Sequence, residues 1–218
     1  MTSFRKLVIV VLCSGALAGL ALFAMQHFTV VPLIEAAERF EHEDHHAAEW
    51  KPAEGWERTS WTALTSVLTG IGFAAVLFGF LATTGREVGV RQGLMWGVAA
   101  FACFHLAPAM GLPPLPPGVP VPDVQDRQIW WSFAVLATAV GLWLIACRTW
   151  MRGIAGVVCL LLPHLIGAPT VAGEAAVPVE LLRNFTIASL ATTAVFWPML
   201  GAIGGFVSSR LLRSQARG

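Results

Sequence analysis

Three histidines lie inside apolar stretches of the sequence, and they are the residues best placed for chemistry. His27, His105 and His164 each occur in a hydrophobic run whose centre contains no Asp, Glu, Lys or Arg. Imidazole nitrogens bind divalent transition metals, and an ionisable side chain within a membrane-spanning segment is a functional candidate by default. For His27 alone we favour the structural interpretation, an interfacial imidazole held by hydrogen bonds.

His105 and His164 have closely matching surroundings, FHLAP at 104–108 and PHLIGAP at 163–169. The prolines are predicted to break each helix just past its histidine and to free backbone carbonyls there. Non-helical backbone at membrane depth is tolerated only where it is buried in protein or lines a cavity. We therefore predict that the two imidazoles, both neutral, and the loosened carbonyls form one shared cation site.

A second group of possible metal ligands lies in the segment 32–58. Residues 32–50 favour a helix, with Pro32 in its first turn. At about 100° per residue, three imidazoles and three carboxylates then share one face, a ligand set that suits a divalent transition metal. The alternative is an ordinary solvated acidic face. The residues on that face are Glu35, Glu38, His42, His45, His46 and Glu49.

The sequence at 42–46 also matches the zinc-protease pattern H-E-x-x-H. That chemistry needs a packed helix, a third ligand and a shielded cleft, and the only nearby third ligands, Glu54 and Glu57, are unconvincing. We reject a protease. The chain lacks GxxxxGK[ST] and GxSxG motifs, and its only lysines are Lys6 and Lys51. We therefore expect a transporter component rather than an enzyme, with no ATPase activity and no tightly bound cofactor.

The composition places these residues in a membrane protein. Hydrophobic residues make up 56% of the 218 residues and charged residues 12%, whereas soluble domains carry about 25% charged residues. The mean hydropathy is +0.68. The four cysteines form no CxxC pair, and we interpret them as apolar packing residues.

Six apolar segments are long enough to be read as membrane spans. We predict an all-α, polytopic helical bundle that forms one membrane domain, 1–218. The first segment is interpreted as a retained helix rather than a cleaved signal peptide, and the short fifth segment could instead be re-entrant, leaving five crossings. The predicted spans are 7–31, 60–82, 92–110, 129–147, 153–168 and 186–209.

Loop charges predict the orientation. Lys and Arg are enriched in cytoplasmic loops, and most of the 14 basic residues fall on the side of the N-terminus. Of the 13 acidic residues, only Glu87 falls on that side. Six spans with both termini in the cytoplasm fit this distribution.

The six spans can be grouped as three hairpins. Each outward helix carries one of the three apolar histidines, followed within a few residues by Pro32, Pro108 or Pro169. This weak repeat places all three histidines at one depth near the outer face. Three spans also carry GxxxG, which permits close helix contact: Gly15/Gly19, Gly93/Gly97 and Gly201/Gly205.

The predicted outer loop 108–128 is rich in proline, with seven of the 13 prolines between Pro108 and Pro122. Such a segment is extended and stiff. We interpret it as a spacer or a lid.

Several stretches resemble the CbtA family of predicted cobalt transporter subunits. They are VPLIEAAE at 31–38, LTGIGF at 68–73, FHLAPAMGLPP at 104–114, RQIWW at 127–131, PHLIGAP at 163–169 and VPVEL at 177–181. The resemblance implies a bacterial protein of the cytoplasmic (inner) membrane, linked to cobalt uptake for cobalamin synthesis. It also implies five spans and a small single-span partner that carries histidines. His42, His45 and His46 do not belong to the family pattern.

These observations predict a permease, or a permease subunit, that takes up a divalent transition metal. Cobalt as the transported ion rests on the resemblance, because nitrogen and oxygen ligands bind copper, nickel and zinc at least as readily. One alternative is an accessory subunit that captures metal for another transporter. Another is a redox subunit that holds a single haem near the outer face.

Overall fold

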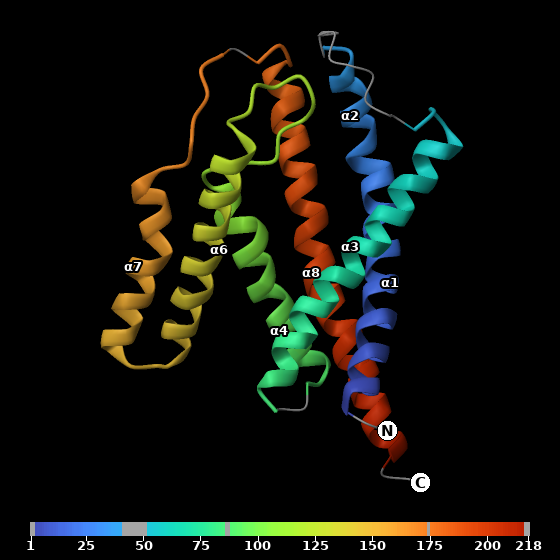
Figure 1. Cartoon of the computed structure of the whole chain (residues 1–218), viewed down its shortest axis with the longest axis vertical. Coiled ribbons are helices and arrows are strands. Elements are labelled where there is room, and N and C mark those ends of the chain that lie inside the picture. Colours follow the sequence, from blue (N-terminus) through green and yellow to red (C-terminus); the bar gives the residue numbers. More distant parts are fainter. Residues whose placement is uncertain (1–2, 41–51, 86–87, 174, 216–218) are drawn as a thin grey trace. The chain divides into compact units, whose positions relative to one another are not determined.

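The computed structural model describes residues 3–40, 52–85, 88–173 and 175–215, and within these ranges it contains helices and no strand. The prediction of an all-α chain is confirmed for this part of the chain. Figure 1 shows the elements in chain order: α1 (Ser3–Thr29), α2 (Val31–Glu38), α3 (Trp56–Thr83), α4 (Val90–Phe101), the π-helix η1 (Ala102–Leu106), α5 (Ala107–Ala109), α6 (Val124–Ala146), α7 (Trp150–Ile166) and α8 (Val179–Gln215).

Four helices are long and apolar enough to cross a membrane: Phe4–Thr29, Trp56–Thr83, Val124–Ala146 and Val179–Leu211. The predicted third span corresponds to α4, η1 and α5, which follow one another without a break. The predicted fifth span corresponds to α7, a shorter apolar helix of 17 residues. The number of crossings and the orientation of the chain stay predictions.

The helices begin and end at residues whose chemistry suits those positions. Asp123 precedes α6, and its carboxylate accepts a hydrogen bond from the Gln125 N–H at 2.8 Å, as an N-cap does. Gly167 follows α7 with φ 89°, a backbone conformation that disfavours a side chain. Gly85, two residues after α3, has φ 65°.

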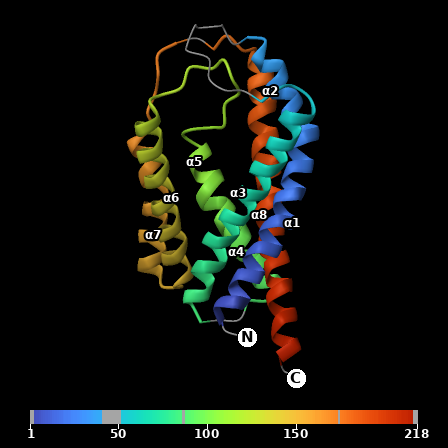
Figure 2. The same cartoon turned by 45° about the vertical axis from the view of Figure 1, so that its right-hand side comes forward.

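The chain divides into two compact units, and the prediction of a single membrane domain stays a prediction. Unit 1 comprises 1–31, 43–98 and 191–218. In it α1 packs against α3, side by side in Figures 1 and 2. Phe196, Trp197 and Leu200 of α8 are buried in its core, with the Phe73 ring 4.7 Å from the Trp197 ring.

Glycines form the helix seams of unit 1. A Cβ on Gly15 would lie 2.5 Å from the Ile71 Cα, and one on Gly19 would lie 2.6 Å from the Ser66 carbonyl oxygen. Between α4 and α8, a Cβ on Gly93 would collide with the Gly201 carbonyl group, and a Cβ on Gly201 would collide with the Gly93 carbonyl group. The close helix contacts predicted from the GxxxG spacings are therefore confirmed.

Unit 2 comprises 32–42 and 99–190. Within it α6 and α7 form an antiparallel hairpin joined by a short turn (Figure 2). A Cβ on Gly156 would lie 2.6 Å from the Gly141 carbonyl oxygen, so the two backbones nearly touch there. The other neighbours of α6 are η1 and α5.

Candidate functional site

His105 lies within the π-helix η1. The Ala107 N–H donates to the carbonyl of Ala102, five residues earlier, whereas an α-helix would pair it with Cys103. Pro108 follows and has no N–H, so it cannot donate to Cys103 in the π register or to Phe104 in the α register. Short π segments of this kind occur frequently at functional sites.

The prolines do not end the two helices in the way the sequence predicted. Pro108 lies inside the helical run, which continues to Ala109, because the widened π turn accommodates a residue without an N–H. α7 ends at Ile166, where Gly167 adopts a positive φ, and Pro169 lies beyond that end. Pro163 is buried within α7.

The His105 side chain is half-buried and lies against its own helix. Its ring is stacked on Phe101, with centroids 6.3 Å apart and planes at 17°. Phe101 and His105 lie four residues apart and therefore share a helix face. Phe104 lies on another face, where its ring centroid is 6.1 Å from that of Trp131 of α6.

His164 occupies the last turn of α7 and is also half-buried. Its ring meets the Trp130 indole edge-on, with centroids 6.2 Å apart. Trp130 is 6% exposed, and its indole N–H has no acceptor among the described residues. Through Trp130, the beginning of α6 therefore contacts the end of α7.

The ends of the two histidine-bearing helices approach each other around Trp130. A Cβ on Gly111, just after α5, would lie 2.5 Å from the Trp130 ring atom Cζ2 and 3.0 Å from the Ala168 Cβ. Ala168 follows α7 at the same end of unit 2. Direct convergence of His105 and His164 on one ion stays a prediction.

The other predicted ligands lie elsewhere in the chain. His27 belongs to unit 1, where its ring contacts Phe23 at 5.6 Å and Phe28 at 5.2 Å. Glu35 and Glu38 lie on α2, exposed and half-buried respectively.

Of the helix predicted over 32–50, α2 covers Val31–Glu38, and the helix ends there in a turn at Arg39 and Phe40. The other predicted ligands of this segment lie outside the described residues: His42, His45, His46 and Glu49. Among the residues that the structure does describe, no three His, Cys, Asp or Glu side chains gather closely enough to hold a metal ion. Any complete metal site built from this part of the chain would need other ligand types.

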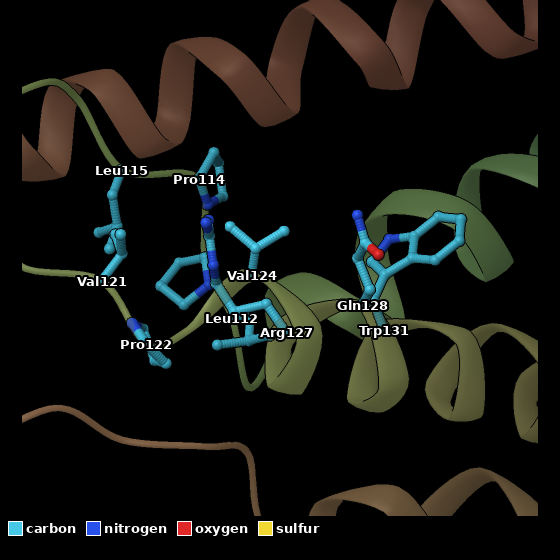
Figure 3. A pocket seen from close by; sticks show the side chains of 10 residues that line it. Leu112, Pro114, Leu115, Val121, Pro122, Val124, Arg127, Gln128 and Trp131 are labelled. Carbon is cyan, nitrogen blue, oxygen red and sulfur yellow. The ribbon is translucent and has the colours of Figure 1, made fainter. Parts of the chain in front are cut away.

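The proline-rich loop and the beginning of α6 together line a cavity of about 400 Å³ (Figure 3). The Thr186 hydroxyl of α8 donates to the Pro114 carbonyl at 3.0 Å and anchors the loop. Arg127 is the only cation that lines the cavity. Its Nε is buried without a hydrogen-bond partner among the described residues. The lining is otherwise mostly apolar, with Gln128 as a further polar side chain.

Sequence reasoning did not single out Trp130 or Gly111 as parts of this region. The signals available were the RQIWW segment, which puts Trp130 in the second turn of α6, and a glycine two residues after the helical run that carries His105. The contacts of these two residues form only when the proline-rich loop and α7 fold around them.

The fold defines a class of protein. Over the described ranges the long helices are apolar. Large hydrophobic side chains such as Leu165 (80%) and Trp143 (64%) are exposed, as on lipid-facing helices and rarely on soluble surfaces. The protein is a multi-pass helical membrane protein.

The sequence model of one family matches residues 4–209, and its description is "Probable cobalt transporter subunit (CbtA)". The chain belongs to this family, and the resemblance stated above is confirmed. The family description supports a membrane protein of cobalt transport that acts as a transporter subunit, and it implies a partner component. No curated protein and no solved structure matches the chain.

Proposed function

We propose that this chain is a permease subunit of the bacterial cytoplasmic membrane that carries a divalent transition metal inward, cobalt for cobalamin synthesis. The observation that supports it most is the meeting of the two histidine-bearing helix ends around Trp130. Each end combines an imidazole inside an apolar helix with a local departure from regular α-helical backbone. Imidazole and carbonyl groups together suit a cation in transit.

Inward movement of the ion needs no ATPase in this chain. A divalent cation that moves into a cell gains about 4.6 kcal/mol per 100 mV of inside-negative potential. The apolar helices exclude a bare ion, so the polar groups at the helix ends must supply the first part of its route. We propose that neutral His105 and His164 bind the same ion on that route, because a ligand must be unprotonated to bind.

We further propose that the partner component is a small single-span membrane protein that contains histidines. The family description as a subunit supports a partner of some kind. In one role, the partner completes the route by which this chain carries the ion. In the other, this chain is an accessory subunit that captures metal and delivers it to the partner. Uptake measured with and without the partner separates these two roles.

The test is cobalt uptake by proteoliposomes that hold the full chain under an imposed inside-negative potential. His105→Ala and His164→Ala should each remove most of the uptake, and the double variant should be little worse than either single one, because groups that act as a unit are not additive. His27→Ala is the matched control, since His27 lies in unit 1 among phenylalanines, and it should keep most of the uptake.

Independent, multiplying losses for His105 and His164 would contradict a shared site. Uptake that depends entirely on the partner would favour the accessory role. A Soret band in the visible absorption spectrum of the purified protein would favour the redox alternative.

A further inference from the structure

The cavity between the proline-rich loop and the beginning of α6 has an apolar wall on one side and polar side chains on the other. Its volume of about 400 Å³ is within the range of about 300–1,000 Å³ that is typical of small-molecule pockets. The loop contributes only leucine, proline and valine side chains, among them Leu115 and Val121 (Figure 3). The side chains in the lining that can donate hydrogen bonds all come from α6: Arg127, Gln128 and Trp131.

Arg127 has no counter-charge in this cavity. Its Nε is buried without a hydrogen-bond partner among the described residues, and none of them that lines the cavity is Asp or Glu. The two acids closest to Arg127 in the sequence are engaged or directed elsewhere. Asp123 caps α6 by accepting from the Gln125 N–H, and the exposed Asp126 lines a different hollow. A buried donor without an acceptor is costly, so the cavity favours an anionic ligand.

The position of the cavity along α6 adds to this preference. Val124, the first residue of α6, lines the cavity, and the N-terminal end of a helix carries a partial positive charge. α6 has 23 residues, so at about 1.5 Å per residue it is roughly 34 Å long, slightly longer than a bilayer core of about 30 Å.

If α6 spans the bilayer, its first turns therefore lie at the depth of the lipid headgroups. Trp131, which is 39% exposed, suits this depth, because tryptophan is enriched where the membrane meets water. The anions available to Arg127 at this depth include the phosphate groups of lipids.

We propose that this cavity binds one anionic phospholipid, with its phosphate on Arg127 and Gln128 and its glycerol and upper acyl groups against the apolar wall of the loop. A guanidinium presents a planar fork of donors that matches the oxygens of a phosphate. A free phosphate ion would leave the apolar wall unmatched, whereas a phospholipid matches both sides of the cavity. The site needs no metal, so it is independent of the function proposed above.

The test is native mass spectrometry of the purified full chain in detergent micelles, titrated separately with phosphatidylglycerol and with phosphatidylcholine of the same acyl chains. Phosphatidylglycerol should bind more tightly, because phosphatidylcholine carries its own cation beside the phosphate. Arg127→Gln should weaken phosphatidylglycerol binding about tenfold and remove the preference. Arg127→Lys should have a smaller effect, because lysine keeps the charge and loses the planar fork.

The matched control is Arg183→Gln. Arg183 is an exposed arginine near the beginning of α8, three residues before the Thr186 that anchors the loop, and it does not line the cavity. This variant should bind both lipids as the unchanged protein does. A further variant, Val124→Phe, keeps Arg127 and fills part of the cavity, and it should weaken phosphatidylglycerol binding. Circular dichroism should show that each variant is folded.

Equal affinities for the two lipids in the unchanged protein, or a preference that survives in Arg127→Gln, would overturn the site. If Arg127→Gln fails to fold, unchanged phosphatidylglycerol binding in Val124→Phe would overturn it instead. Displacement of the bound lipid by an equal concentration of inorganic phosphate would assign the cavity to a free anion and overturn the lipid as its occupant.

Discussion

At the scale of single residues, the position of His105 depends on Pro108. Proline lacks the N–H that an α-helix would use at this place, and the helix widens to the π register from Ala102 to Leu106. A π turn changes the rotation of all residues beyond it relative to those before it. The direction of the His105 imidazole is therefore tied to a residue three positions later.

Pro108→Ala should abolish most of the cobalt uptake while the helix stays intact. The restored N–H lets the segment return to the α register and turns His105 away from its present direction. The thermal stability of the protein should be unchanged or raised, because an unfavourable residue leaves the helix. Uptake in proteoliposomes and the melting temperature are the two measurements.

Pro198→Ala is the control for that variant. Pro198 lies inside α8 within unit 1, in a helix that has no π segment. The Pro198→Ala variant should keep its cobalt uptake. Equal losses in both variants would mean that removing any helix proline disturbs the bundle, and would contradict a special role for the π turn.

At the scale of elements, glycine seams decide how closely the helices pack. In unit 1 the backbones of α1 and α3 touch at Gly15, Gly19 and Gly70. In unit 2, Gly141 and Gly156 bring α6 and α7 together in the same way. Because lipid supplies little hydrophobic driving force between helices, such close van der Waals contact is a main source of their association.

Gly70→Ala should destabilise the protein, and Gly72→Ala should not. A Cβ on Gly70 would collide with the Gly15 carbonyl and lie 2.9 Å from the Gly19 Cα, whereas one on Gly72 meets nothing within 4 Å. We expect a loss of about 1–3 kcal/mol for the first and a small gain for the second, since alanine is the better helix former. Thermal unfolding in detergent measures both, and equal melting temperatures would contradict the seam.

At the scale of the whole molecule, the GxxxG seams and the residues of the candidate site lie in different units. Unit 1 holds α1, α3 and the GxxxG seams, together with His27. Unit 2 holds His105, His164, Trp130 and the cavity lined by the proline-rich loop. The predicted orientation assigns the end of unit 2 at which α6 begins to the outer side of the membrane.

Single cysteines test that orientation in a variant without the four native cysteines. Thr84→Cys, on the predicted cytoplasmic side, should be shielded from an impermeant thiol reagent added to intact cells. Thr170→Cys, on the predicted outer side, should be labelled, because positively charged loops stay in the cytoplasm. Both positions are exposed, and the reverse labelling pattern would place the beginning of α6 on the inner side.

The sequence by itself determined the features that depend on local composition and spacing. Apolar runs long enough to span a bilayer predicted helices at α1, α3, α6 and α8, because their backbone groups must be satisfied within the segment. The GxxxG spacings predicted the seams at Gly15 and Gly93, since residues four apart share a helix face. The motif residues around His105 and His164 identified the family.

Only the tertiary structure decided the contacts between residues far apart in the chain. The meeting of Gly111 and Ala168 around Trp130 depends on how η1, α6 and α7 pack. The π register at His105 likewise required the folded backbone, because a proline near a helix end is compatible with a break, a kink or a widened turn. Local sequence leaves these choices nearly equal in free energy, and packing between the helices selects one of them.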